Sequence, residues 1–309
     1  MEVDEEKIYW ALPTWSLRGP TVENVEKFSV NIGGNHWLEE AIRMFRLNGF
    51  VLLRNALSRD LADALWQHCQ QLQPGLRWRF PNGNRGDGRI SFAKASKIGS
   101  LLHHSTWVSI LKCEELLKMI KAVMPDGGYC VSGGGDFVFE GCPKYQRIHS
   151  DIPSVHAPFD RAFPPPFVCA NVVVHPISYD NGPMRIIPGT QEIAQWARRS
   201  RRHLPTQCDE PENWRRSVLA PLEPGDIIVR DVRTLHGGTP NKSTATRFLP
   251  SVEFASFPFL RSEQYTWPCS PSLPQDAYDE LPWEAQGLCN RIVAPRETID
   301  TDWRESVNS

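Results

Sequence analysis

The chain has 309 residues and a formal net charge of -2 at pH 7, and 40% of its residues are hydrophobic. This hydrophobic share is ordinary for a globular protein and is enough for a sizeable core. The near-zero charge gives no indication of a nucleic-acid or membrane partner, and we expect neither.

The targeting and cysteine patterns predict a cytoplasmic protein. Eight cysteines are scattered along the chain without a CxxC pair, which argues against a structural zinc site and favours free thiols in a reducing compartment. The segment MEVDEEKIYW is acidic and has no apolar signal core, and no apolar run is long enough to span a membrane. The last residues, SVNS, differ from the SKL peroxisomal address.

The N-terminal third is predicted to be mainly helical. After an irregular arm over residues 1–35, apolar residues at helical spacing predict a helix over 36–48, which Gly49 ends. The run FVLLR (Phe50–Arg54) predicts a short strand, and Ser58 is a predicted N-cap for a helix reaching about Leu72. Residues 74–90, rich in glycine and proline, predict a surface loop or a lid over a pocket.

The remainder is predicted to be mainly β. A helix is expected near 114–123, and from Gly128 short β-rich runs alternate with turn residues, interrupted by one helix over 190–199. This pattern predicts an antiparallel sheet rather than βαβ units. We therefore expect one α+β, mainly β domain over residues 1–309, with an arm at 1–35, a core at 36–256 and a C-terminal wrap at 257–309.

Two segments, QRIHSDIP and LHGGTPNKSTATR, carry the candidate metal ligands. His149 and Asp151 are two residues apart, so on a strand they face the same side and can reach one ion. His236 follows the strand DIIVRD, which the turn EPGD begins. Two imidazoles and one carboxylate are the ligands of non-haem Fe(II) oxygenases, and they leave positions open for chemistry. His-x-Asp alone is a weak signal, and we interpret the other histidines as surface or hydrogen-bonded residues: His36, His68, His103, His104, His156, His175 and His203.

Arg247 is the candidate counter-ion for a co-substrate. It stands near the start of the run TRFLPSVEF. A hairpin after His236 would bring it back beside the strand that precedes His236. A guanidinium can hold a carboxylate through two parallel charge-assisted bonds. The alternative interpretation is a structural salt bridge.

Four stretches together resemble the phytanoyl-CoA dioxygenase family of Fe(II)- and 2-oxoglutarate-dependent oxygenases: NGFVLLRNALS, IHSD, YDNGPMRIIPGTQ and LEPGDIIVRDVRTLHGGTPNKSTATR. The likeness runs from about residue 38 to residue 256. It implies a double-stranded β-helix (jelly-roll, or cupin-like) core with flanking N-terminal helices. It also implies that His149, Asp151 and His236 bind iron and that Arg247 binds the distal carboxylate of 2-oxoglutarate.

The resemblance suggests three further co-substrate contacts. Gln146 stands where relatives place such a contact, and Asn171 and Thr239 are additional polar candidates. Each of these side chains can equally satisfy local backbone groups.

The function that the resemblance implies is oxidation of a small organic molecule or natural-product intermediate, with O2 and 2-oxoglutarate as co-substrates and succinate and CO2 as co-products. Asp151 argues against halogenation, because related halogenases carry a small residue there. Phenylalanines and prolines at residues 153–167 indicate a stiff apolar pocket rim and thus an amphiphilic substrate. Hydroxylation is the first hypothesis; desaturation, epimerisation or ring formation at the same iron is the second. A non-catalytic jelly-roll sensor is the third.

Overall fold

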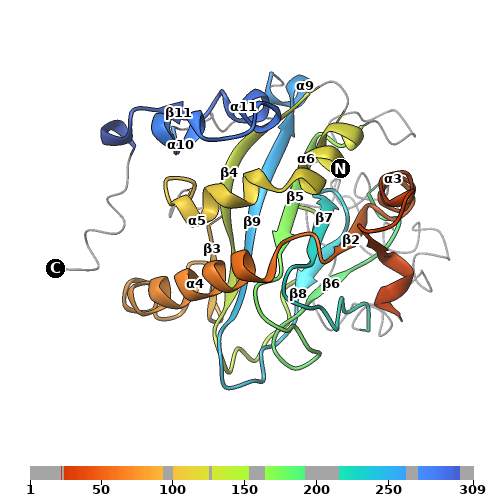
Figure 1. Ribbon diagram of the computed structural model, residues 1–309. Coiled ribbons are helices and arrows are strands. Elements are labelled where there is room, and N and C mark those ends of the chain that lie inside the picture. Colours follow the sequence, from red (N-terminus) through yellow and green to blue (C-terminus); the bar gives the residue numbers. More distant parts are fainter. Residues whose placement is uncertain are drawn as a thin grey trace, which may run out of the picture.

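The computed structural model describes residue 22 and residues 24–92, 100–124, 127–152, 164–191, 216–261 and 271–299. Its largest element is a seven-stranded sheet with the spatial order β1–β2–β7–β5–β9–β4–β3 (Figure 1). Neighbouring strands are antiparallel except for the edge pair β1–β2. The strands are β1 (Ser29–Asn31), β2 (Phe50–Arg54), β3 (Arg89–Ser91), β4 (Gly128–Val138), β5 (Phe167–Val172), β7 (Ile227–Asp231) and β9 (Arg247–Ser256).

A smaller sheet packs against the large one. It consists of β6 (Met184–Ile186) and β8 (His236–Gly238), and isolated bridges extend it from β8 to His149 and from β6 to Val218. Along the chain, β5, β7 and β9 of the large sheet alternate with β6 and β8 of the small sheet. This two-sheet, antiparallel connectivity is that of a jelly-roll. The predicted α+β, mainly β class with a double-stranded β-helix core is confirmed.

The two faces of the large sheet have different roles. On β9, Val252 and Phe254 belong to an apolar cluster shared with the helices, whereas Leu249 packs with residues of the small sheet. Side chains alternate along a strand, so Ser251 and Glu253 share the face of Leu249 and point into the jelly-roll. Both are buried. Polar groups are thus placed in the interior, where a site can form.

Helices cover the opposite face of the large sheet. Figure 1 shows α4, α5 and α6 lying across it, and their apolar residues belong to the same buried cluster as the outward-facing residues of β7 and β9. The predicted N-cap is confirmed, because Ser58 Oγ accepts a hydrogen bond from Leu61 N–H. The helices of this region are α3 (Trp37–Asn48), α4 (Arg59–Arg79), α5 (Ser105–Val108) and α6 (Glu114–Val123), with 3-10 turns at Val25–Phe28 and Ser109–Lys112.

The predicted end of α4 near Leu72 is wrong, because the helix continues through Pro74 to Arg79. Pro74 removes one backbone hydrogen-bond donor from the helix. The next turn is held in place by tertiary contacts, because Leu76 is buried in the apolar cluster between the helices and the large sheet. The guanidinium of Arg77 pairs with Glu140 and lies 4.2 Å from the centre of the Phe139 ring. These tertiary contacts offset the lost hydrogen bond. The glycine-rich loop is therefore shorter than predicted and leads directly into β3.

The C-terminal segment is more regular than a simple wrap. It contains α9 (Phe257–Leu260), β10 (Leu273–Pro274), α10 (Gln275–Asp279), α11 (Trp283–Cys289), β11 (Val293–Ala294) and a 3-10 turn at Arg296–Thr298. Apolar residues from Leu273 to Ile292 belong to the same buried cluster as Val30 and the apolar residues of the helices.

The described residues show the state of six cysteines and allow a search for membrane-spanning helices. The six cysteines placed there are free and buried. Within the same residues, no helix is long and apolar enough to cross a membrane.

Candidate metal centre

The two predicted histidine ligands are brought together by backbone pairing. The backbones of His149 and His236 exchange two hydrogen bonds, each 2.9 Å long, although the residues lie far apart in the sequence. Directly paired residues of an antiparallel bridge project to the same face. The centres of the two imidazole rings are accordingly only 4.5 Å apart.

Asp151 completes a three-residue cluster. Its backbone N–H donates to Val232 O over 3.0 Å, which anchors it to the loop before β8. Its Oδ1 lies 3.5 Å from Nε2 of His149 and 3.5 Å from Nε2 of His236. In the part of the chain that the structure describes, no other histidine, cysteine or acidic residues form such a group, whose ligand atoms lie within 4.8 Å of one another.

Both imidazoles present Nε2 to the cluster. Nδ1 of His149 lies 2.7 Å from Arg147 O, and Nδ1 of His236 lies 2.9 Å from Thr234 O. A carbonyl oxygen only accepts, so Nδ1 carries the proton and Nε2 keeps a lone pair. Burial, reinforced by the nearby positive charge of Arg230, lowers the pKa of His236 to about 4. The imidazole is therefore neutral at pH 7, as a metal ligand must be.

Asp151 is held ionised by its neighbours. Burial opposes the charge of the carboxyl, but His236, Arg230 and His149 outweigh it, and its pKa is held well below the ordinary value. The side chain is 38% exposed, so an ion can reach it. Two imidazoles that turn Nε2 to the cluster and one carboxylate fit a divalent metal that accepts nitrogen and oxygen ligands, such as Fe(II).

Arg230 is a neighbour of this cluster that the sequence analysis missed. It comes from β7, is 4% exposed, and donates from Nη1 to Asp151 Oδ2 over 2.9 Å. In the sequence, Arg230 directly follows the apolar run IIV within the same strand. A charged residue at such a position is unusual, and this was the signal that could have identified it.

The strands next to Arg230 extend a polar surface into the jelly-roll. Strand register places Cys169 opposite Arg230, and Glu253 opposite Cys169. One row further along, Asn171 lies opposite Ser251. Nδ2 of Asn171 is buried and has no hydrogen-bond partner among the described residues, so it is a donor able to bind a ligand.

Arg247 is buried at the start of β9. Nε donates to Gly182 O over 3.0 Å and Nη1 donates to Asp136 O over 2.7 Å, both backbone carbonyls. Burial lowers its pKa to about 10, so the guanidinium remains charged at pH 7. Among the residues that are placed, no carboxylate oxygen lies within 4.0 Å of it. This disfavours the structural salt bridge and leaves a buried cation that fits an anionic ligand.

The two remaining predicted contacts are engaged with the backbone. Oε1 of Gln146 accepts from Gly238 N–H over 3.0 Å. The Thr239 hydroxyl donates to Pro183 O over 2.8 Å. Both contacts stabilise the small sheet, and a co-substrate contact from either residue stays a prediction.

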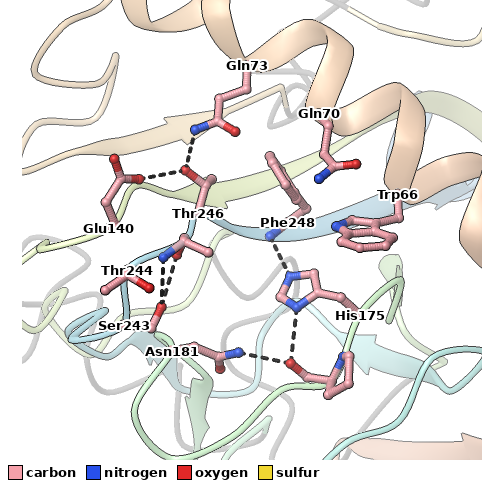
Figure 2. Close-up of a pocket in the computed structure, with 12 residues that line it drawn as sticks. Trp66, Gln70, Gln73, Glu140, His175, Asn181, Ser243, Thr244, Thr246 and Phe248 are labelled. Carbon is pink, nitrogen blue, oxygen red and sulfur yellow. Dashed lines mark hydrogen bonds between the residues drawn. The ribbon is translucent and has the colours of Figure 1, made fainter.

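A cavity of about 460 Å³ is lined by α4, through Trp66, Gln70 and Gln73, and by the segment that leads into β9 (Figure 2). Phe248, which lines it, occupies the face of β9 opposite to Arg247. Phe248 N–H donates to His175 Nε2 over 3.0 Å, so His175 is a hydrogen-bonded histidine, as predicted. The cavity contains none of the candidate ligands and is separate from the metal centre.

Some sequence-based predictions fall outside the described residues. These are residues 1–21 and 23 of the predicted arm, residues 153–163 of the predicted pocket rim with His156, residues 192–199 of the predicted helix, and His203.

Comparison with known families identifies the family of the chain. The family model described as phytanoyl-CoA dioxygenase (PhyH) matches residues 45–249, more than half of the chain. The chain belongs to the phytanoyl-CoA dioxygenase family. It is thus a non-haem iron enzyme that depends on 2-oxoglutarate, and the matched range includes His149, Asp151, His236 and Arg247. No curated protein matches the chain.

Several solved structures are similar to this phytanoyl-CoA dioxygenase family member. The non-heme alpha ketoglutarate dependent epimerase SnoN from nogalamycin biosynthesis is 16% identical, with a TM-score of 0.49 over 71% of this chain and 80% of that one. HygX from Streptomyces hygroscopicus, solved with nickel, 2-oxoglutarate and hygromycin B, is 13% identical, with a TM-score of 0.49 over 71% and 87%.

Proposed function

We propose that the chain uses Fe(II) bound by His149, Asp151 and His236 to hydroxylate a small organic molecule. The observation that carries this proposal is the convergence of two imidazole Nε2 atoms and one carboxylate oxygen within 4.8 Å of one another. Overall, the substrate C–H bond, O2 and 2-oxoglutarate would be converted to C–OH, succinate and CO2.

The residues of the chain would bind and orient the reactants. His149, Asp151 and His236 would hold the iron and would leave part of its coordination sphere free for the co-substrates. When bound, the iron and 2-oxoglutarate supply the oxygen activation and the oxidative decarboxylation. The carbonyl contacts of Nδ1 keep both imidazoles in the tautomer and orientation that metal binding requires.

We infer that 2-oxoglutarate is held from inside the jelly-roll. Arg247 is a buried cation without a described carboxylate partner, and it would bind the distal carboxylate. Asn171 offers a buried N–H donor on the same inner face. An anionic, oxygen-rich ligand would give Arg247 an ion-pair partner and Asn171 Nδ2 a hydrogen-bond acceptor, which favours 2-oxoglutarate.

An amphiphilic substrate is the class that the surroundings of Asp151 support. Cys169, which lies opposite Arg230, belongs to an apolar cluster that also contains Ile152, Phe167, Val232 and Phe259. A substrate with an apolar body and a polar group would match these two surfaces. Desaturation, epimerisation or ring formation at the same iron is the alternative, and it depends on how the substrate lies.

A binding experiment without oxygen tests the site. Mixing the protein with Fe(II) and 2-oxoglutarate under anaerobic conditions should produce a visible charge-transfer band. Asp151→Ala and His236→Ala should abolish the band, whereas His104→Ala, which removes a half-buried histidine of the helix layer, should retain it. A wild-type protein that gives no band would contradict the proposal and favour a non-catalytic jelly-roll. Hydroxylation itself would then be tested by screening metabolites for succinate release above the uncoupled background.

A further inference from the structure

Arg230 is a buried cation in contact with a candidate ligand, although it cannot bind a metal itself. It is 4% exposed and lies on a central strand of the large sheet. Removing a guanidinium from water is costly unless it is paired with an anion. The ion pair that the structure shows for Arg230 is with Asp151, over 2.9 Å.

The contact divides the two oxygens of Asp151 between different partners. Oδ2 accepts from Arg230 Nη1, while Oδ1 faces Nε2 of both His149 and His236. If the carboxylate rotated, Oδ2 would leave Arg230, and a buried charge would lose its partner. The carboxylate is thus held in one orientation before any metal arrives.

The position of Arg230 is itself fixed by the fold. Arg230 pairs with Phe50 on one side and with Cys169 on the other, so its backbone is held within three neighbouring strands. Its Nη1 lies 3.1 Å from Nδ1 of His236. That nitrogen already donates to Thr234 O, so it does not accept from Arg230, and Asp151 remains the acceptor.

We propose that Arg230 is a positioning residue that makes Asp151 a one-oxygen metal ligand. By occupying Oδ2, the guanidinium prevents the carboxylate from binding the ion through both oxygens. With one oxygen from Asp151 and one nitrogen from each imidazole, a six-coordinate ion would keep three positions for other ligands. With both oxygens of Asp151 it would keep only two. The inference rests on the metal site of the proposed function and adds a requirement to it.

The opposing physical effect is repulsion between the guanidinium and a divalent cation. If repulsion dominated, removal of Arg230 would tighten metal binding; if positioning dominates, removal weakens it. Loss of a group that orients a metal ligand typically weakens metal affinity about 10- to 100-fold. The two effects therefore predict opposite signs for one measurement.

The measurement is the affinity for Co(II), used alone as an oxygen-insensitive substitute for Fe(II), by competition with a chelating dye. Arg230→Met should weaken binding about 10- to 100-fold, and Arg230→Lys should fall between it and wild type, since an ammonium restores charge without the planar fork. Arg54→Met is the matched control, because it breaks an ion pair with the buried carboxylate of Asp226 that does not touch Asp151 or the loop before β8. It should lower thermal stability but leave Co(II) affinity within about twofold of wild type.

A rescue experiment separates positioning from general damage. In Asp151→Gly, formate can occupy the space of the lost carboxylate, where Arg230 would hold it. Formate should therefore strengthen Co(II) binding by Asp151→Gly, and this gain should disappear in the Asp151→Gly, Arg230→Met double variant. Equal or tighter Co(II) binding by Arg230→Met, or equal rescue in both backgrounds, would overturn the inference. A wild-type protein that binds no Co(II) would instead overturn the metal site of the proposed function.

Discussion

Arg247 shows how a single residue can distinguish a ligand site from a structural ion pair. Its guanidinium is buried and bonds to two backbone carbonyls, and the placed residues provide no carboxylate within ion-pair distance. Carbonyl oxygens satisfy N–H groups but do not neutralise the charge. Arg247 is therefore a buried cation with no described carboxylate at ion-pair distance, and a dicarboxylate would supply that partner.

We expect Arg247→Ala to raise the apparent Kd for 2-oxoglutarate at least tenfold while Co(II) binding survives. Loss of one partner of a buried charge pair costs roughly 2–5 kcal/mol. Titration of 2-oxoglutarate into the Co(II)-loaded protein measures the change, and wild-type protein titrated with succinate controls for general carboxylate binding. An unchanged Kd for 2-oxoglutarate would refute the assignment of Arg247.

At the scale of elements, the connection between α3 and β2 holds the segment that precedes His236. Gly49 ends α3 with φ +79°, and its carbonyl oxygen accepts from Asp231 N–H and from the Thr234 hydroxyl. Those two residues stand at the ends of the loop that leads to His236. A Cβ at position 49 would overlap Thr234 Oγ1 and lie 2.7 Å from Gln191 Oε1.

Gly49→Ala should therefore destabilise the protein by roughly 2–4 kcal/mol, because backbone strain and overlap add. Gly86→Ala is a matched control: Gly86 has the same φ of +79°, but a Cβ there meets nothing within 4 Å. It should cost only the strain, on the order of 1 kcal/mol. Urea unfolding of both variants measures the difference, and equal losses would show that the overlap at position 49 has no effect.

The predictions of individual elements succeeded where the signal was local. Apolar spacing and Gly49 located α3 to within one residue of its start, and Ser58 located the start of α4. The end of α4 was wrong because it depends on contacts of Leu76 and Arg77 with distant parts of the chain. A proline predicts a helix end only when no such tertiary contacts compensate.

For the whole molecule, buried neutral histidines predict acid sensitivity. The pKa values of His175 and His236 are each lowered to about 4, chiefly by burial. In the unfolded chain a histidine titrates near 6.5. Between these values the unfolded state binds more protons, so the free energy of unfolding is greatest above pH 6.5 and falls as the pH drops towards 4.

Urea unfolding of the metal-free protein at pH 7 and pH 5 should show this loss, on the order of 1–2 kcal/mol for each of the two histidines. His175→Gln should lose less stability than wild type over the same interval. His36→Gln is the control, because the side chain of His36 is 83% exposed. If His175→Gln and wild type lost the same amount, protonation of His175 would not contribute to acid unfolding.

The sequence by itself determined the family, the jelly-roll and the identity of the candidate ligands. His149 and Asp151 share a strand face through local spacing, and the segments around His236 and Arg247 carry a recognisable pattern. Only the tertiary structure decided which atoms meet: the contacts of both Nδ1 atoms with carbonyl oxygens, the division of the Asp151 oxygens, and the approach of Arg230. The physical reason is that contacts between distant segments depend on strand register and burial, whereas residue spacing specifies only the face on which each side chain lies.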